Sequence, residues 1–146
     1  MKITNYALVG LVNELGQYSE KKLPQKISYA ITRNIMLATK EYQVYETQLN
    51  RVMTSYADNM IKDDNGDVKT NNIGIPFVEE SCREDFNREI EELLNFEIDI
   101  EIYKVDESVF DYDDNGKYDV LTVNDILFLQ SILCANEENS AKEGDK

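Results

Sequence analysis

The stretch most able to do chemistry is an acidic run with the spacing of a calcium-binding loop. From Asp111 to Asp119 the sequence DYDDNGKYD places oxygen-bearing side chains at the first, third, fifth and ninth positions and glycine at the sixth. Glycine matters there because the chain must turn sharply around the ion. The twelfth position, which should supply a bidentate glutamate, is Thr122. We therefore predict no tight calcium site, and calcium binding no stronger than about millimolar.

Other residue types that support catalysis are scarce or poorly placed. The chain has no histidine, which removes the commonest general base and every Ser-His or Cys-His nucleophile pair. Its two cysteines, Cys82 and Cys134, are too few for a zinc site and fit small buried residues of a reducing compartment. Adjacent carboxylates such as Glu91-Glu92 do not face one another on a helix. The residues predict a protein that is not an enzyme and needs no metal or cofactor.

Acidic charge is concentrated in one segment. The 146 residues include 29 Asp and Glu against 15 Lys and Arg, a net charge of −14, and residues 77–119 alone hold sixteen acidic and four basic residues. A negatively charged surface repels nucleic acid and anionic membranes, and it attracts cations or basic protein surfaces. We therefore expect this segment to dock on a basic protein surface, and we do not expect direct nucleic-acid binding. The residues predicted to make that contact are Glu84, Glu91, Glu92, Glu97, Asp99, Glu101, Asp113 and Asp114.

A long helix is the strongest structural prediction. From residue 24 to about residue 60, apolar residues recur at steps of three and four, and Pro24 suits the first turn. Such a helix would be roughly 50 Å long, more than the rest of the chain is expected to cover, so we predict that part of it pairs with a second copy or a partner. The alternative is that helices predicted over 4–16, 79–94 and 123–134 cover it. The stripe expected to form the interface is Tyr42, Tyr45, Leu49, Val52 and Tyr56.

The remaining segments predict a small β element. Residues 97–105 alternate strictly between apolar and mostly acidic side chains, which is typical of a half-buried strand with an acidic outer face. Its partner strand could come from residues 66–75 or from residues 73–78. The Asn65-Gly66 pair predicts a tight turn that separates the long helix from these candidate partner strands. No internal repeat is evident.

Together these elements predict an α+β fold that is mainly helical. It has three to four helices, including one long helix (about 24–60), and a two- or three-stranded β element. Thr122-Val-Asn-Asp125 has the spacing of a capping box and should open the last helix. We expect a single globular domain over residues 1–135 and a disordered acidic tail over 136–146. No apolar run is long enough for a membrane span or a signal peptide, so a cytoplasmic location is expected.

This layout resembles that of small proteins encoded by phages of Gram-positive bacteria. The opening helix, the long tyrosine-bearing helix, the EIDIEIYKV strand and the closing LTVNDILFLQSIL helix carry the resemblance, over residues 1–134. Such phage proteins have no generally assigned activity, so the resemblance transfers no site residue. By analogy of class, small acidic phage proteins include inhibitors of host defence nucleases that mimic nucleic acid.

Three hypotheses about function follow in order of preference. The first is a non-enzymatic, phage-type interaction protein of the host cytoplasm, whose acidic surface docks on a basic host protein such as a defence nuclease. The second is a virion or assembly component that oligomerises through the long helix as a homodimer or larger assembly. The third is an enzyme that uses carboxylates and a divalent metal.

Overall fold

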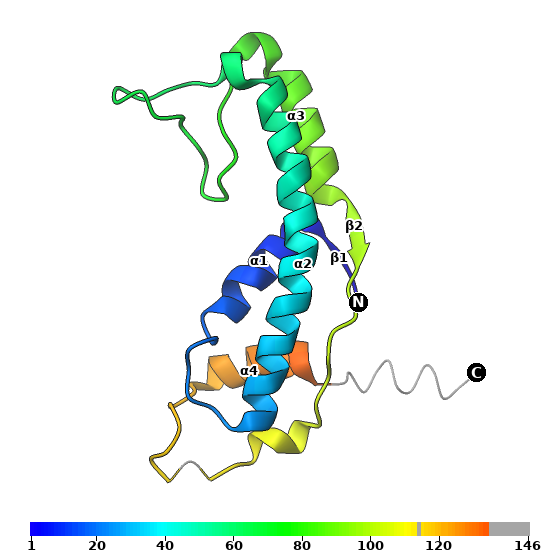
Figure 1. Cartoon of the computed structure of the whole chain (residues 1–146), viewed down its shortest axis with the longest axis vertical. Coiled ribbons are helices and arrows are strands. Elements are labelled where there is room, and N and C mark those ends of the chain that lie inside the picture. The colour runs from blue at the N-terminus through cyan, green and yellow to red at the C-terminus, as the bar shows by residue number, and fades with distance from the viewer. Residues whose placement is uncertain (114, 135–146) are drawn as a thin grey trace, which may run out of the picture.

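The computed structural model describes residues 1–113 and 115–134, and its architecture is α+β and mainly helical (Figure 1). This confirms the predicted fold class, including the one long helix. Asp114 and the predicted tail over 136–146 lie outside the described residues. The elements in chain order are β1 (Lys2–Thr4), α1 (Asn5–Gly16), α2 (Gln25–Ser55), a 3₁₀ turn (Ala57–Asn59), α3 (Glu80–Asn95), β2 (Glu97–Asp99), a second 3₁₀ turn (Glu107–Phe110) and α4 (Val123–Leu133).

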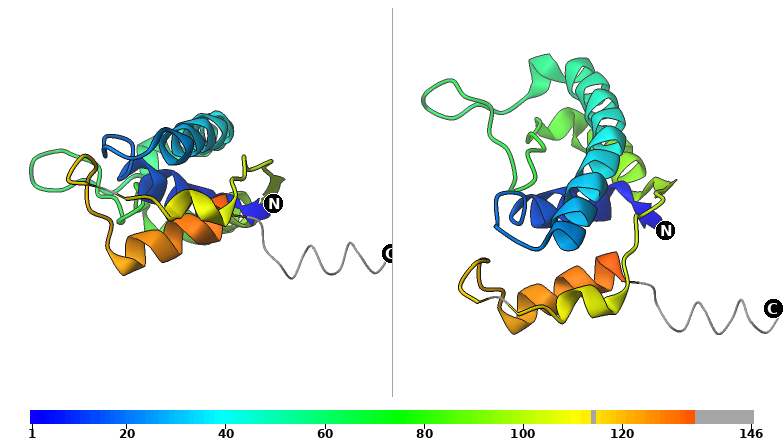
Figure 2. Two further views of the ribbon diagram at one scale, coloured as in Figure 1. Left: turned by 90° about the horizontal axis from the view of Figure 1, so that it is seen from below. Right: turned by 60° about the horizontal axis from the view of Figure 1, so that its bottom comes forward.

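Helix α2 runs along the long axis of the molecule (Figure 1). Two apolar clusters pack against it, one along each half. The N-terminal core joins the first half of α2 to α1, α4 and residues 100–102, and contains Leu8 and Leu129. Figure 2 shows α4 beneath α1 and α2, at the end away from α3. The C-terminal core joins the second half of α2 to α3 and residues 73–78, around Phe86. Tyr42 packs against both clusters, so the apolar interior continues along the helix.

The helices begin where the sequence supplies caps. The Thr4 hydroxyl accepts a hydrogen bond from the Ala7 amide at the start of α1, at 3.2 Å. At the start of α4 the predicted capping box is confirmed: the Thr122 hydroxyl accepts from the Asp125 amide at 3.1 Å, and the Asp125 carboxylate accepts from the Thr122 amide at 2.9 Å. Each cap satisfies amides that a helix leaves unpaired in its first turn.

Helix α2 ends earlier than the sequence predicts. It stops at Ser55, about five residues short of the expected end, and a 3₁₀ turn follows. The hydroxyls of Thr54 and Ser55 donate to the carbonyls one turn earlier, at 2.7 and 3.2 Å, a pattern that weakens a helix. Tyr56 then leaves helical geometry, with φ −116° and ψ 16°.

The predicted partner of the 97–105 strand is wrong. β2 pairs antiparallel with β1 at the N-terminus, with Ile3 opposite Ile98, and not with residues 66–78. Asn5 explains the pairing, because its amide donates to the Phe96 carbonyl and its side chain donates to the Leu93 carbonyl, which fixes the start of α1 against the end of α3. The ladder is also shorter than predicted, since the chain beyond β2 leaves β1 and runs along α2.

Residues 60–78 form a projecting unit, here called the arm (Figure 1). Three short extended segments meet in it through single antiparallel bridges rather than a regular ladder. Ile61, Lys69 and Phe77 close a ring of backbone hydrogen bonds, in which each amide donates to the carbonyl of another member at 2.9 Å. The three residues are spaced eight apart in the sequence, so the three extended segments of the arm meet around this ring.

The arm contains an internal repeat that the sequence analysis missed. The Asp63 carboxylate accepts from the amides two and four residues later, at 2.9 and 3.0 Å, and the Asn71 side-chain oxygen does the same at 3.0 and 2.9 Å. Gly66 and Gly74 occupy matching positions with φ of +83° and +81°, where a side chain would be strained. Only the side-chain oxygen and the glycine are common to the two loops, so identity alone does not reveal the repeat.

Candidate functional site: an acidic face

Residues predicted to contact a basic partner lie on the surface. α3 and β2 follow one another along one side of α2 (Figure 1), and the exposed predicted residues that they and the adjoining residue 101 carry are here called the acidic face, whereas Asp113 lies in the loop before α4. Asp114 is outside the described residues. The exposed members of the acidic face are Glu84, Glu91, Glu92, Glu97, Asp99 and Glu101.

Most of this negative charge has no counter-charge in the part of the chain that the structure describes. Among the described residues there are two ion pairs, one between Asp85 and Arg88 and one between Asp99 and the N-terminal amine, at 3.1 Å. Asp99 is therefore the only member of the acidic face with a cationic partner in the described part of the chain. Exposed carboxylates without counter-charges produce a field that attracts basic surfaces.

The backbone that carries the second half of this face is held by a buried side chain. Asn34 of α2 is fully buried, its side-chain nitrogen donates to the Tyr103 carbonyl at 3.0 Å, and its side-chain oxygen accepts from the Tyr103 amide at 2.7 Å. The alternation predicted for this segment is present, since Ile100 and Ile102 are buried while Glu101 is exposed. The acidic side chains therefore stand on an ordered support.

The tyrosine stripe on α2 is largely covered by the rest of the chain. Tyr45 and Leu49 are 3% and 8% exposed, and Tyr42, Val52 and Tyr56 are half-buried. The expectation that the rest of the chain is too short to cover this stripe is wrong. Helix α3 and residues 73–78 cover it, and the Phe86 ring meets the Tyr56 ring edge-on at 5.1 Å between centroids.

Two tyrosines of the stripe have perturbed hydroxyl groups. The Tyr56 hydroxyl donates to the Glu89 carboxylate at 2.6 Å, and this hydrogen bond is the main cause that raises the pKa of Tyr56 to about 12. The Tyr45 hydroxyl is buried and has no hydrogen-bond partner among the described residues. Burial, with a smaller contribution from Tyr42, raises the pKa of Tyr45. Tyr45 therefore stays neutral and holds an unsatisfied polar group.

A groove of about 480 Å³ runs between α2 and α3, beside the acidic face. Sequence analysis missed it, although the exposed positions that flank the buried stripe recur at helical spacing. Its members combine carboxylates with apolar side chains and include no lysine or arginine. The described residues that line it are Asn5, Glu41, Val44, Tyr45, Gln48, Val52, Glu89, Glu92, Leu93, Phe96 and Ile98.

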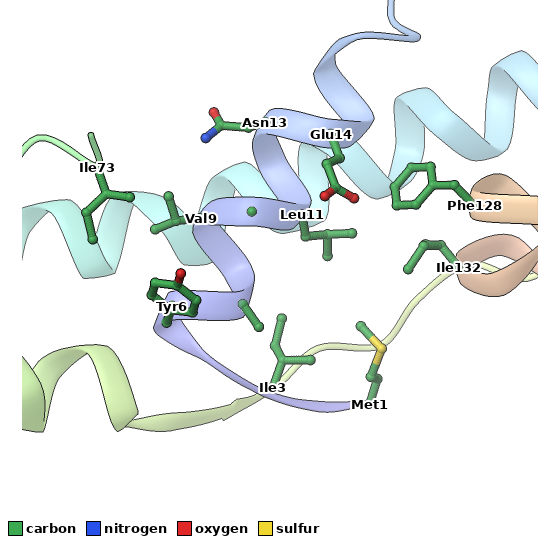
Figure 3. A pocket seen from close by; sticks show the side chains of 12 residues that line it. Met1, Ile3, Tyr6, Val9, Leu11, Asn13, Glu14, Ile73, Phe128 and Ile132 are labelled. Carbon is green, nitrogen blue, oxygen red and sulfur yellow. The ribbon is translucent and has the colours of Figure 1, made fainter. Parts of the chain in front are cut away.

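A second groove, of about 490 Å³, lies between α1, α4 and the arm (Figure 3). Tyr6 and Val9 face Ile73 of the arm at one end, and Phe128 and Ile132 of α4 close the other. Its lining is apolar apart from Asn13, the Tyr6 hydroxyl and the single carboxylate of Glu14, so it carries less charge than the acidic face.

The calcium-like loop uses one of its carboxylates for structure. The Asp119 side chain accepts from the Lys22 amide at 2.7 Å, and its own amide donates to the Lys22 carbonyl at 2.8 Å. Asn115 and Gly116 turn the chain with φ of +48° and +73°. In the described part of the chain, no three His, Cys, Asp or Glu side chains are grouped so that they could hold a metal ion. Weak calcium binding by the whole loop stays a prediction.

Comparisons with known proteins do not point to a function. No protein-family model, no curated protein and no solved structure matches this chain. Within the described residues, no helix is both long and apolar enough to cross a membrane.

Proposed function

We propose that this protein is a non-enzymatic interaction protein whose acidic face docks on a basic surface of another protein. The observation that carries the proposal is the row of exposed carboxylates along α3 and β2, of which only Asp99 has a cationic partner among the described residues. Such a row lowers the energy of a basic partner as it approaches and raises the association rate.

The most natural owner of a complementary surface is a protein that binds nucleic acid. Its basic groove is built to neutralise regularly spaced phosphates, and a row of carboxylates on a rigid support presents a comparable pattern of charge. Bound there, the acidic face would exclude DNA or RNA. A host defence nuclease is the partner that the phage-like layout suggests, and this part of the proposal rests on that resemblance alone.

The alternative of an assembly protein that oligomerises through the tyrosine stripe has less support. Tyr45 and Leu49 are already buried by α3 and the arm, so they are not available to a second copy without unfolding the C-terminal core. No comparable observation favours an enzyme.

The proposal is tested by reversing charge on the acidic face. The variant Glu97→Lys, Asp99→Lys, Glu101→Lys should lose capture of its partner from a bacterial lysate at about 50 mM salt, and the wild-type complex should dissociate near 1 M salt, where screening shortens to about 3 Å. The captured protein is then purified and its Kd measured against both forms.

A matched control keeps the total charge change but moves it off the face. Glu20, Glu46 and Asp58 are exposed and lie elsewhere, so their reversal to lysine should leave the Kd within about threefold of wild type. Equal losses in both triple variants, or a Kd that does not depend on salt, would contradict the proposal.

A further inference from the structure

We infer that the groove between α2 and α3 is the docking site for one basic amphipathic helix of a partner protein. The inference rests on the proposed function and specifies it, because the groove borders the acidic face and shares Glu92 with it. A flat acidic face needs only positive charge in its partner. The groove adds a requirement for apolar side chains at helical spacing.

The walls of the groove expose apolar surface that nothing in the described chain covers. Val44 on α2 is 60% exposed and Phe96 at the end of α3 is 64% exposed, one on each side. Leu93 and Ile98 between them are half-buried. Large apolar side chains gathered around a concave surface are typical of a contact site rather than of a solvated helix.

The charge around the groove selects a basic occupant. Glu41 enters it from α2, and Glu89 and Glu92 enter from α3, while no lysine or arginine is among the described residues that line it. An apolar ridge flanked by lysine or arginine would pair with both features at once. This is the pattern of an amphipathic helix lying in an apolar groove with complementary charges at its edges.

The dimensions fit a helix of about three turns. The lining residues of α2 extend from Glu41 to Val52, and at 1.5 Å per residue this is about 16 Å. A bound helix of roughly eleven residues would place apolar side chains along that length at spacings of three and four.

An unsatisfied hydroxyl gives independent evidence that the groove is incomplete. Tyr45 lines it, is 3% exposed, and carries the buried hydroxyl that lacks a hydrogen-bond partner among the described residues. Native proteins pair nearly all buried polar groups, so an unpaired one marks a place where a partner atom is missing. A polar group of the docked helix that reaches Tyr45 would supply it.

The chain itself is a poor source of the occupant. Residues 135–146 carry no large apolar side chain and more acidic than basic residues. A second copy would bring another net charge of −14, and this repulsion opposes self-association. A basic helix from a different protein meets neither obstacle.

The test uses a fluorescein-labelled synthetic peptide of fourteen residues, built from leucine, lysine and alanine, with leucine at helical spacing along one face. Its affinity for the full chain is measured by fluorescence anisotropy at about 50 mM salt, beside a scrambled peptide of the same composition. We expect Val44→Lys to weaken binding at least tenfold, because it removes an apolar contact and adds a like charge. Phe96→Ser should weaken it similarly from the opposite wall.

Met36 provides a matched control. It lies on α2 eight residues before Val44, is 69% exposed and is outside the groove, so Met36→Lys makes the same chemical change at a comparable site. It should alter affinity less than threefold, and the scrambled peptide should bind at least tenfold more weakly than the amphipathic one.

Three results would overturn the inference. Equal effects of Val44→Lys and Met36→Lys, or equal binding of the scrambled peptide, would leave only general attraction to the acidic face, and the proposed function would survive. A wild-type dimer in sedimentation that Val44→Lys converts to monomer would assign the groove to a second copy. Failure of the proposed function has a different signature, which is partner binding indifferent to salt and to the triple reversal on the acidic face.

Discussion

The two ends of α2 bury apolar surface in similar ways but present opposite charge to solvent. Between its start and its midpoint Lys26, Arg33 and Lys40 are exposed, and Arg33 lies over the Tyr103 ring at 4.9 Å and donates to the Tyr29 hydroxyl at 3.2 Å. Along its second half, the charged side chains that line the groove between α2 and α3 are acidic and come largely from α3, although Arg51 is also exposed there. The cationic end is thus partly engaged by aromatic side chains of its own chain, while most carboxylates of the acidic face have no cationic partner among the described residues.

The cores at the two ends also differ in what closes them. The N-terminal core is enclosed by α1, which precedes α2 in the chain, and by residues 100–102 and α4, which come from the last third of the chain. The C-terminal core is enclosed by α3 and the arm, which follow α2 directly. The C-terminal core is closed by segments that follow α2 in the chain, so it can open while the N-terminal core stays folded. We therefore expect its local unfolding to require less free energy than that of the N-terminal core.

The largest effect is expected from breaking the C-terminal core. Phe86 is 1% exposed and central to it, so Phe86→Ala should lower the free energy of unfolding by about 3–5 kcal/mol. Hydrogen exchange should speed up in α3 and the arm while α1 and α4 stay protected.

Leu129→Ala is the matched test of the other end. Leu129 is fully buried in the N-terminal core, and its truncation should cost about 2–5 kcal/mol. Exchange should then rise in α4 and α1 first. Uniform loss of protection in both variants would contradict the difference in cooperativity.

The sequence predicts the parts of this comparison that depend on local pattern. Apolar spacing identifies α1, α2, α3 and α4, and the capping box at Thr122 and Asp125 is confirmed because both of its hydrogen bonds join residues three apart. The alternation in residues 97–105 likewise indicates which side chains are buried. Local periodicity and local hydrogen bonds carry this information.

The parts that depend on distant contacts could not be predicted. β1 has only three residues, too few for a visible pattern, and it pairs with β2 almost a hundred residues later because Asn5 fixes α1 against the end of α3. The stripe shows the same limit, since an apolar face looks the same in the sequence whether α3 or a second copy covers it, and here α3 and residues 73–78 bury Tyr45 and Leu49. The groove between α2 and α3 depends on the distance between the two helices, which cannot be inferred from the local pattern of residues.

Two buried asparagines allow a finer test of how the ends are tied to the rest of the chain. Asn34 makes two hydrogen bonds with the backbone of Tyr103 at the cationic end, whereas the Asn5 side chain makes one with Leu93 near the acidic end. Asn34→Ala should lower the free energy of unfolding by about 3 kcal/mol, because it leaves two backbone groups unpaired. Asn5→Ala should cost about 1–2 kcal/mol. Chemical denaturation measures the decrease in the free energy of unfolding for each variant. Equal decreases would contradict the expectation that Asn34, with two hydrogen bonds, contributes more than Asn5.

The smallest expected effect has the opposite sign. Because the Tyr45 hydroxyl is buried without a hydrogen-bond partner in the described part of the chain, Tyr45→Phe should raise the free energy of unfolding by about 1 kcal/mol. Tyr42→Phe is the control: its ring lies 5.7 Å from that of Tyr45 and is half-buried, and this change should stay within about 0.5 kcal/mol. If Tyr45→Phe instead destabilises the protein, the hydroxyl has a partner, such as a buried water. It would then give no evidence that the groove awaits a partner group. A variant that is more stable alone yet binds the amphipathic peptide less tightly would show that the acidic end gives up stability in the free protein for a contact made only in the complex.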